Sequence, residues 1–312
     1  NNQGKKTEIQ WKGAGATPYS RHADGRAVLR SSVREYLMSE ALFHLKIPTT
    51  RALSLSFTGE NVVRDIMYDG NAEYEKGAVM VRTAESFLRF GHFELISAQN
   101  EIETLRKLAD FTIENYFPKI DLESPEKYAD FFKEIANRTA KMIVEWFRVG
   151  FVHGVMNTDN MSVLGLTIDY GPFSFLDDYD LNFTPNTTDL PGRRYAFGNQ
   201  GKIAQWNLWQ LANALFPLIK DEKILEKTLN DFTEIFWEKH DKMMAEKFGF
   251  DSVLESDGEF FTEAQQLLGD LRIDYTLFFN RLEELKEDSD LRIHFQDACY
   301  NPILEGQFLQ LE

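Results

Sequence analysis

The stretch VGFVHGVMNTDNMSVLGLTIDYG, residues 149–171, organises the rest of the chain. It reads as HGxxxxxN followed by IDYG, two polar clusters separated by an apolar segment of strand character. Asn160 and Asp169, expected at the edge of a hairpin of apolar residues, form an oxygen-ligand pair suited to Mg²⁺ on a nucleotide phosphate. In protein kinases this frame carries an aspartate two residues after the histidine, and that aspartate receives the substrate proton. Val155 stands there instead, so the sequence keeps the metal-binding half of a kinase site and lacks its usual base.

The composition of the 312-residue chain limits its class. Hydrophobic residues make up 43% and aromatic residues 13%, which predicts a folded protein with a sizeable core. The chain has 34 Lys and Arg against 50 Asp and Glu, and its net charge of -16 would repel nucleic-acid phosphates. No run approaches the length of a membrane-spanning helix, and the start NNQGKKTEIQ has no apolar signal segment. We therefore expect a soluble intracellular protein without nucleic-acid or membrane partners.

Several common catalytic classes lack their sequence signatures. The single cysteine, Cys299, cannot form an internal disulfide or a Cys-based zinc site, and we interpret it as an ordinary buried thiol rather than a reactive one. The histidines form no HxxxH or HExxH pattern and the chain has no GxSxG, so zinc-hydrolase and serine-hydrolase chemistry have no support.

The first part of the chain is typical of a small antiparallel sheet crossed by one helix. Residues 7–12, TEIQWK, alternate like a strand and end at Lys12, and a Gly-rich connector follows. A helix is predicted next, and two further strands are predicted over 49–57 and 77–84. The apolar face of the helix is expected to comprise Val33, Leu37, Ala41 and Leu45. This order of elements is the outline of a protein-kinase N-lobe.

Four charged residues of this part are candidates for phosphate recognition. Lys12 is either a surface lysine on an edge strand or a phosphate ligand. Glu35 either forms a capping box with Ser32 or pairs with the strand lysine, and the strand-then-helix order favours the ion pair. Arg82 and Arg89 either share one face of a helical turn and clamp phosphate oxygens or are solvated helix charges.

From about residue 98 the composition becomes helical and acidic, which predicts two domains, an N-lobe over residues 1–97 and a helical C-lobe over 98–312. Helices are predicted over 99–117 and 125–148. The second helix is expected to bury Phe131, Phe132, Ile135, Met142, Ile143, Trp146 and Phe147.

The segment 171–202 has no periodicity and is rich in Pro, Gly, Asn and Asp, so we interpret it as a functional loop. Its acidic residues Asp177, Asp178 and Asp180 either bind metal or form a solvated acidic turn. A helix follows, with Trp206, Leu208, Leu211 and Leu215 predicted as core. Residues 221–312 show no catalytic constellation.

Five longer stretches resemble the selenoprotein O family, whose bacterial members are called YdiU-type proteins. They are WKGAGATPYSRHADGRAVLRSSVREYLMSEAL, IPTTRALSL, GFVHGVMNTDNMSVLGLTIDYGPFSFLDDYD, GRRYAFGNQ and WNLWQLANAL. The resemblance covers about residues 7–220. It implies an α+β, protein-kinase-like, two-lobed fold, with a small antiparallel sheet and a helix in the N-lobe and a mainly helical C-lobe. The family has a further Gly-rich phosphate-contacting motif upstream of the lysine, so the resemblance also implies that the N-terminal part of this fold is missing from the sequence.

The resemblance implies roles for nine residues. Asp159 would be the catalytic proton acceptor in place of the base missing at Val155. Asn160 and Asp169 would bind Mg²⁺, with Mn²⁺ as an alternative. The nucleotide-binding residues would be Lys12, Glu35, Asp24, Gly25, Arg82 and Arg89.

The activity that the resemblance implies is that of a pseudokinase-type protein adenylyltransferase, which transfers AMP from ATP to Ser, Thr or Tyr hydroxyls of protein substrates. ATP would bind in the reverse sense, with its outer phosphates buried and its α-phosphate exposed. Two alternatives stay open: a non-catalytic nucleotide-binding scaffold, favoured by Val155, and a phosphotransferase acting on a small molecule, favoured by the HG frame. The expected location is the cytoplasm of a bacterium, or the mitochondrion if the source is eukaryotic.

Overall fold

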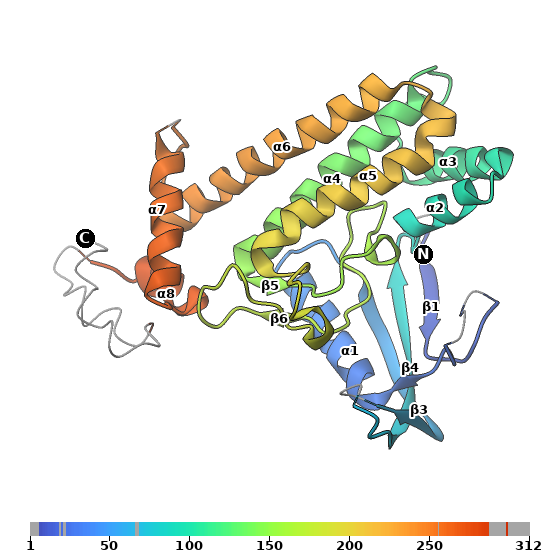
Figure 1. Ribbon diagram of the computed structural model, residues 1–312, viewed down its shortest axis with the longest axis horizontal. Coiled ribbons are helices and arrows are strands. Elements are labelled where there is room, and N and C mark those ends of the chain that lie inside the picture. Colours follow the sequence, from blue (N-terminus) through green and yellow to red (C-terminus); the bar gives the residue numbers. More distant parts are fainter. Residues whose placement is uncertain are drawn as a thin grey trace.

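A four-stranded antiparallel sheet lies at the lower right of Figure 1. The computed structural model describes residues 6–18, 20, 23–65, 69–254, 256–286 and 298, so Cys299 lies outside the described residues. The strands of the sheet are β1 (Glu8–Lys12), β2 (Ala27–Val28), β3 (Arg51–Arg64) and β4 (Glu73–Ala84). β4 is central: β3 pairs along one edge, and β1 and β2 pair along the other. The predicted small antiparallel sheet is confirmed.

The register of β1 on β4 brings four side chains to one face of the sheet. Gln10 pairs with Arg82, and Lys12 pairs with Met80. Residues two apart in a strand share a face, and directly paired residues on neighbouring strands share it too. Lys12 and Arg82 therefore project from the same side of the sheet, the side that helix α1 covers.

Helix α1 (Leu29–His44) packs on β3 and β4 and buries a polar side. Leu37 is 63% exposed, and Val33 and Leu45 are exposed as well, so the predicted apolar face is wrong. The reason is that charged residues of the sheet pair with α1. The side of the helix that faces the sheet is therefore mostly polar. The buried residues of α1 are Ser32, Glu35, Ser39 and Leu42.

The rest of the described chain is mainly helical, and the helices predicted over 99–117 and 125–148 are present as α3 and α4. The helices are α2 (Phe90–Ala98), α3 (Ile102–Tyr116), α4 (Lys127–Val149), α5 (Gln200–Ile219), α6 (Glu222–Phe248), α7 (Asp257–Asp270) and α8 (Tyr275–Glu283). Short 3-10 segments are η1 (Thr158–Asn160), η2 (Thr187–Asp189) and η3 (Phe197–Asn199). α4, α5 and α6 run side by side and contact one another (Figure 1).

The core of the helical part is aromatic, and α4 supplies its centre. All seven α4 residues predicted as core are buried. On α5 the expectation is met for Leu208, Leu211 and Leu215 but wrong for Trp206, which is exposed. Trp206 precedes Leu208 by two residues, which places it roughly 200° around the helix from that leucine.

Gly150 caps the C-terminus of α4, and its φ of 71° is the left-handed conformation that glycine adopts at helix ends. The chain then enters β5 (Phe151–Val152), which pairs with β6 (Ser174–Phe175). The hairpin predicted between Asn160 and Asp169 is wrong. The described segment between these two residues forms single bridges to the chain just before α2 and just before β3, and no strand of its own.

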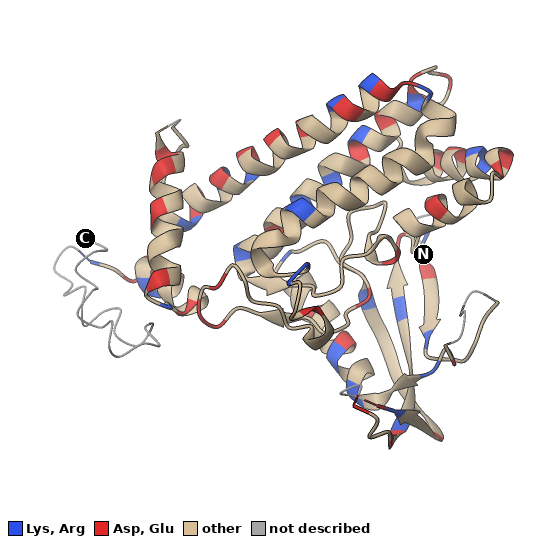
Figure 2. Ribbon diagram, in the orientation of Figure 1, with Lys and Arg blue, Asp and Glu red and all other residues tan. Residues whose placement is uncertain are grey.

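Charged residues of both signs occur along the outer helices, as Figure 2 shows for α6. α7 is different, because its charged residues are all acidic. No helix in the described part of the chain is long and apolar enough to cross a bilayer. The domain boundary between residues 97 and 98 stays a prediction.

Candidate active site

Lys12 lies at the end of β1 between two carboxylates. Its Nζ donates to Glu35 Oε2 at 2.5 Å and to Asp169 Oδ1 at 3.0 Å. Glu35 comes from α1, whose N-cap is Val28 and not Ser32. The capping-box interpretation of Glu35 is therefore wrong, and the ion pair between a strand lysine and a helix glutamate is present.

Arg82 is the buried centre of this cluster, with 2% of its side chain exposed. Its Nη1 donates to Glu35 Oε1 at 2.7 Å and to Asp169 Oδ1 at 2.8 Å. Its Nε and Nη2 both donate to Gln10 Oε1, at 2.8 Å and 2.5 Å. Burial alone would lower the pKa of Arg82, but Asp169 and Glu35 together raise it above its ordinary value. All three nitrogens of this guanidinium are thus engaged within the protein.

Arg89 joins the cluster from another element. It is the N-cap residue of α2, whereas Arg82 lies in β4, so the interpretation of the two arginines as one helical face is wrong. Arg89 Nη1 forms an ion pair with Asp169 Oδ2 and donates to the backbone oxygen of Asp159 at 2.8 Å. Burial lowers the pKa of Arg89, and Asp169 partly opposes that effect. Arg89 therefore connects the two candidate acidic residues of the loop.

Asp169 is the point where three cations meet. Burial acts to raise the pKa of Asp169, but Arg82, Lys12 and Arg89 outweigh it and hold that pKa well below its ordinary value. Its φ of 56° is left-handed, a conformation that aspartate tolerates better than most side chains. The cluster has three cations and, with Glu35, two carboxylates. Its charges sum to one positive charge, which favours binding of an anion.

His153 fixes the backbone that carries Asp169. Its Nε2 lies 2.9 Å from the carbonyl oxygen of Ile168, and the backbone N–H of Val155 donates to its Nδ1 at 3.3 Å. Nδ1 is therefore the acceptor, and Nε2 carries the proton and donates to Ile168. Burial lowers the pKa of His153, which favours this neutral form, and the ring stacks on Trp146. His153 thus positions the backbone at both ends of the loop, at Val155 and at Ile168.

The segment η1 holds Asp159 and Asn160 beside α2. Asn160 Nδ2 donates to the carbonyl oxygen of Val155 at 2.8 Å, which leaves its Oδ1 as the atom for a ligand. Thr158 Oγ1 donates to Glu94 Oε2 at 2.6 Å and ties η1 to α2. The backbone of Val155 thus supports the loop, while its side chain has no proton to exchange.

The residues present fit a magnesium ion. Mg²⁺ is usually held by one or two carboxylates together with substrate phosphates and water, and the loop offers the Asp169 carboxylate and the Asn160 amide oxygen. Asp169 Oδ2 is buried and forms its ion pair with Arg89, so a metal ion at this oxygen would have to displace the Arg89 guanidinium or share the oxygen with it. The described part of the chain contains no group of three or more His, Cys, Asp or Glu residues with metal-binding geometry, so phosphate and water would have to supply the other ligands.

Asp24 and Gly25 have contacts of a different kind. Both oxygens of Asp24 accept from Arg64 of β3 at 2.9 Å, and these bonds are the main reason that the pKa of Asp24 is lowered to about 2. Gly25 has a φ of 65°, and a Cβ there would lie 2.1 Å from the carbonyl oxygen of Gly15. Gly25 thus closes the loop between β1 and β2, Asp24 ties this loop to β3, and none of these contacts involves the Lys12 cluster.

The acidic residues of the loop after Gly171 behave as a structural turn. Asp178 pairs with Arg272 at 2.7 Å, and Asp180 accepts from the backbone of Asn182 at 2.8 Å. Because no metal-ligand group is found among the described residues, the alternative that these residues bind metal has no support there.

Sequence reasoning missed Gln10, the acceptor for two nitrogens of Arg82. Its signal was available, since Gln10 precedes Lys12 by two residues and so shares its face of the strand. Glu94, which holds Thr158, was also missed. It is one turn along α2 from Phe90, and only the packing of α2 on η1 shows its partner.

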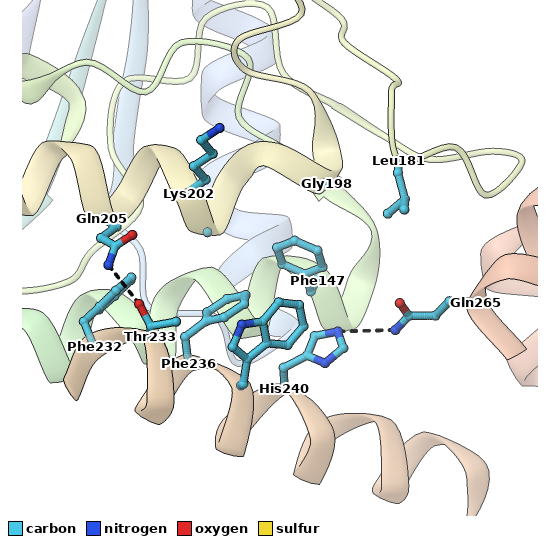
Figure 3. A pocket seen from close by; sticks show the side chains of 12 residues that line it. Phe147, Leu181, Gly198, Lys202, Gln205, Phe232, Thr233, Phe236, His240 and Gln265 are labelled. Atoms are coloured by element: carbon cyan, nitrogen blue, oxygen red, sulfur yellow. Dashed lines mark hydrogen bonds between the residues drawn. The ribbon is translucent and has the colours of Figure 1, made fainter. Parts of the chain in front are cut away.

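A cavity lies away from this cluster, between α5 and α6 (Figure 3). It has a volume of about 280 Å³ and a wall that includes the aromatic rings of Phe147, Phe236 and His240. His240 is buried and contacts Gln265 and Asp241. Lys202 points away from the aromatic rings (Figure 3). The candidate active site is therefore defined by its charges and not by this cavity.

A strand lysine paired with a helix glutamate, next to a loop aspartate, is the arrangement that protein kinases use to bind nucleotide phosphates. The chain belongs to the family described as protein adenylyltransferase SelO, whose model matches residues 1–299.

Curated relatives agree with this family. The chain is 52% identical over 297 residues to protein nucleotidyltransferase YdiU of Cytophaga hutchinsonii, covering 94% of this chain and 57% of the relative. It is 53% identical over 279 residues to the protein of the same name from Flavobacterium johnsoniae, covering 89% of this chain and 53% of the relative. It is 52% identical over 304 residues to the protein of the same name from Azoarcus sp. (strain BH72), covering 96% of this chain and 58% of the relative. The chain thus spans between 53% and 58% of the length of these relatives.

Proposed function

We propose that the protein transfers AMP from ATP to Ser, Thr or Tyr hydroxyls of protein substrates, with Mg²⁺. The observation that carries the proposal is the cluster of Lys12, Arg82 and Arg89 around Asp169, combined with Val155 at the position of the kinase base. Family membership and the name of the relatives support a nucleotidyl transfer. A kinase-like two-lobed fold is part of this proposal.

The cations of the cluster would bind the phosphates of ATP. Lys12 and Arg89 are the more accessible of the three, with 34% and 18% of their side chains exposed. Arg82 would reach a phosphate only after exchanging a partner, because all of its nitrogens are engaged. Without such an exchange it would act through its charge. Glu35 and Gln10 keep these side chains extended toward the site.

Asp159 would accept the proton. The substrate oxygen bonds to the α-phosphorus, the bond from that phosphorus to the bridging oxygen of the β-phosphate breaks, and pyrophosphate leaves. The hydroxyl proton passes to the Asp159 carboxylate. Asn160 and Asp169 would hold Mg²⁺, which when bound neutralises phosphate charge. Asp24 and Gly25 would serve the nucleotide site by closing the adjacent loop.

Intact mass spectrometry after incubation with ATP and Mg²⁺ tests the proposal. We expect an AMP-sized gain in the parent and none in Asp169→Asn, which keeps the shape of the side chain. Asp178→Asn is the matched control, because this aspartate lies in the next loop and pairs with Arg272, and its variant should keep the gain.

Labelled ATP separates the remaining functions. Label from the α position on protein is the expected result. Label transferred only from the γ position to a small acceptor would replace the proposal with a small-molecule phosphotransferase. If Mg-ATP stabilises the protein in a thermal shift but neither label is transferred, the protein is a nucleotide-binding scaffold without catalytic activity.

A further inference from the structure

Gly91, the second residue of α2, lies directly against Asp159. A Cβ built on Gly91 would lie 2.3 Å from Oδ1 of Asp159 and 3.3 Å from its Cγ. Real Cβ atoms essentially never come within 3.0 Å of another atom in this way. The carboxylate therefore occupies the space that any side chain at position 91 would need.

The backbone conformation does not require glycine at this position. Gly91 is not among the described glycines that have a positive φ, and it lies in a helix, where alanine is normally favoured over glycine. The reason for a glycine here is thus the contact with Asp159 and not the path of the chain.

The backbone of η1 cannot easily move away from α2 to make room. Arg89 Nη1 donates to the backbone oxygen of Asp159 at 2.8 Å, and Thr158 donates to Glu94 at 2.6 Å. These bonds tie η1 to two positions of α2 on either side of Gly91. An added methyl group would therefore turn the Asp159 side chain, whose carboxylate is the more mobile part.

We propose that Gly91 is a positioning residue for AMP transfer: its missing side chain lets the Asp159 carboxylate lie at the start of α2, where it takes the proton of the attacking hydroxyl. This inference rests on the proposed role of Asp159. The three atoms nearest to a Cβ on Gly91 all belong to Asp159 and none to a phosphate-binding cation, so we expect the effect to fall on the chemical step. A methyl group at position 91 misplaces the proton acceptor and leaves the nucleotide in place.

Gly91→Ala tests this assignment, and Gly258→Ala is its matched control. Gly258 is also the second residue of a helix, α7, and a Cβ there would meet no atom within 4 Å. We expect Gly91→Ala to lower kcat about 10- to 100-fold, since a displacement of about 1 Å can cost 10²-fold. Its KM for ATP should stay within about twofold of the parent value, and Gly258→Ala should match the parent in both constants.

A double-mutant cycle with Asp159→Ala shows whether Gly91 acts through Asp159. In the Asp159→Ala background, Gly91→Ala should cause no further loss of kcat. Thermal melts give a readout that needs no activity. Gly91→Ala should raise Tm by about 2 °C more in the Asp159→Ala background than in the parent, because the collision is gone.

The outcomes separate the two proposals. If Asp159→Ala abolishes transfer while Gly91→Ala equals Gly258→Ala, the inference is overturned and the proposed function stands. Transfer at the full rate by Asp159→Ala would remove the role of Asp159 and the inference with it. Equal Tm changes in both backgrounds would show that the two side chains do not compete for space, and would also overturn the inference.

Discussion

Glu35→Gln removes the charge that holds Lys12 and Arg82 together, and its cost can be worked out from the structure. The Glu35 side chain is 4% exposed and Arg82 is 2% exposed, and they meet at 2.7 Å. Removing one partner of a buried ion pair typically costs about 3–5 kcal/mol. Asp169 still pairs with both cations after the change, and Lys12 can regain some water, so we expect about 2–3 kcal/mol here.

Glu40→Gln is the control for this prediction, because Glu40 lies on the same helix and also pairs with an arginine of the sheet. Its partner Arg51 is 39% exposed and Glu40 is 26% exposed, at a distance of 2.7 Å. Exposed pairs contribute about 0–1 kcal/mol, so the Glu40 variant should remain close to the parent.

Urea unfolding at pH 7, at low and high salt, measures both variants. The loss in Glu35→Gln should persist at high salt, because water and ions do not reach the pair. The small loss in Glu40→Gln should shrink. Equal losses in the two variants, or a Glu35→Gln loss that disappears with salt, would refute the view that this pair is a buried structural element.

Further predictions concern single buried or half-buried side chains. Gln10→Leu should cost about 2 kcal/mol, because two nitrogens of buried Arg82 lose their acceptor, and urea unfolding measures this loss. Because burial lowers the pKa of His153, the unfolded state binds more protons below pH 6.5, so the parent should lose stability between pH 7 and 5. His153→Gln should lower the free energy of unfolding at pH 7 and make its pH dependence shallower. Burial lowers the pKa of Lys247 from 10.5 to about 8, so stability rises with pH in that interval. The parent should gain about 1–2 kcal/mol relative to Lys247→Met between pH 7.5 and 9.5.

Each of these has its own control. Gln10→Glu keeps an acceptor for Arg82 and should lose less than Gln10→Leu. The free energy of unfolding should fall less between pH 7 and 5 in His153→Gln than in the parent, and an equal fall in both proteins would contradict the reasoning. For Lys247, the rings of Tyr275 and Phe279 favour the charged form and reduce the gain below the value from burial alone. A flat difference from pH 7.5 to 9.5 would show that the rings cancel burial.

The sequence predicted the elements of the site better than their packing. The order of a strand lysine, a helix glutamate and a loop aspartate was sufficient to expect Lys12 near Glu35. This expectation needs little information about distant parts of the chain. The core positions of α4 were predictable because a helix buries residues at a regular spacing. On α1 the same reasoning failed, since the side chain that decides its orientation is Glu35 and the usual apolar spacing does not include it.

Contacts between distant segments could not be predicted. Gln10 and Arg82 are neighbours only because of the register between β1 and β4, which is set by the whole sheet. The approach of Gly91 to Asp159 depends on how α2 packs on η1. A glycine at the second position of a helix gives no local signal of what fills the space beside it.

The left-handed backbone at position 169 has a consequence for which residues can be accommodated there. Only glycine, asparagine and aspartate adopt that conformation readily. Of these three, glycine and asparagine would leave three neighbouring cations facing one another around a neutral group. Position 169 therefore has two independent requirements, a residue that tolerates the left-handed backbone and a negative charge, and aspartate meets both. A genetic selection for active variants should thus return only aspartate at position 169, even where other positions of the loop tolerate many amino acids.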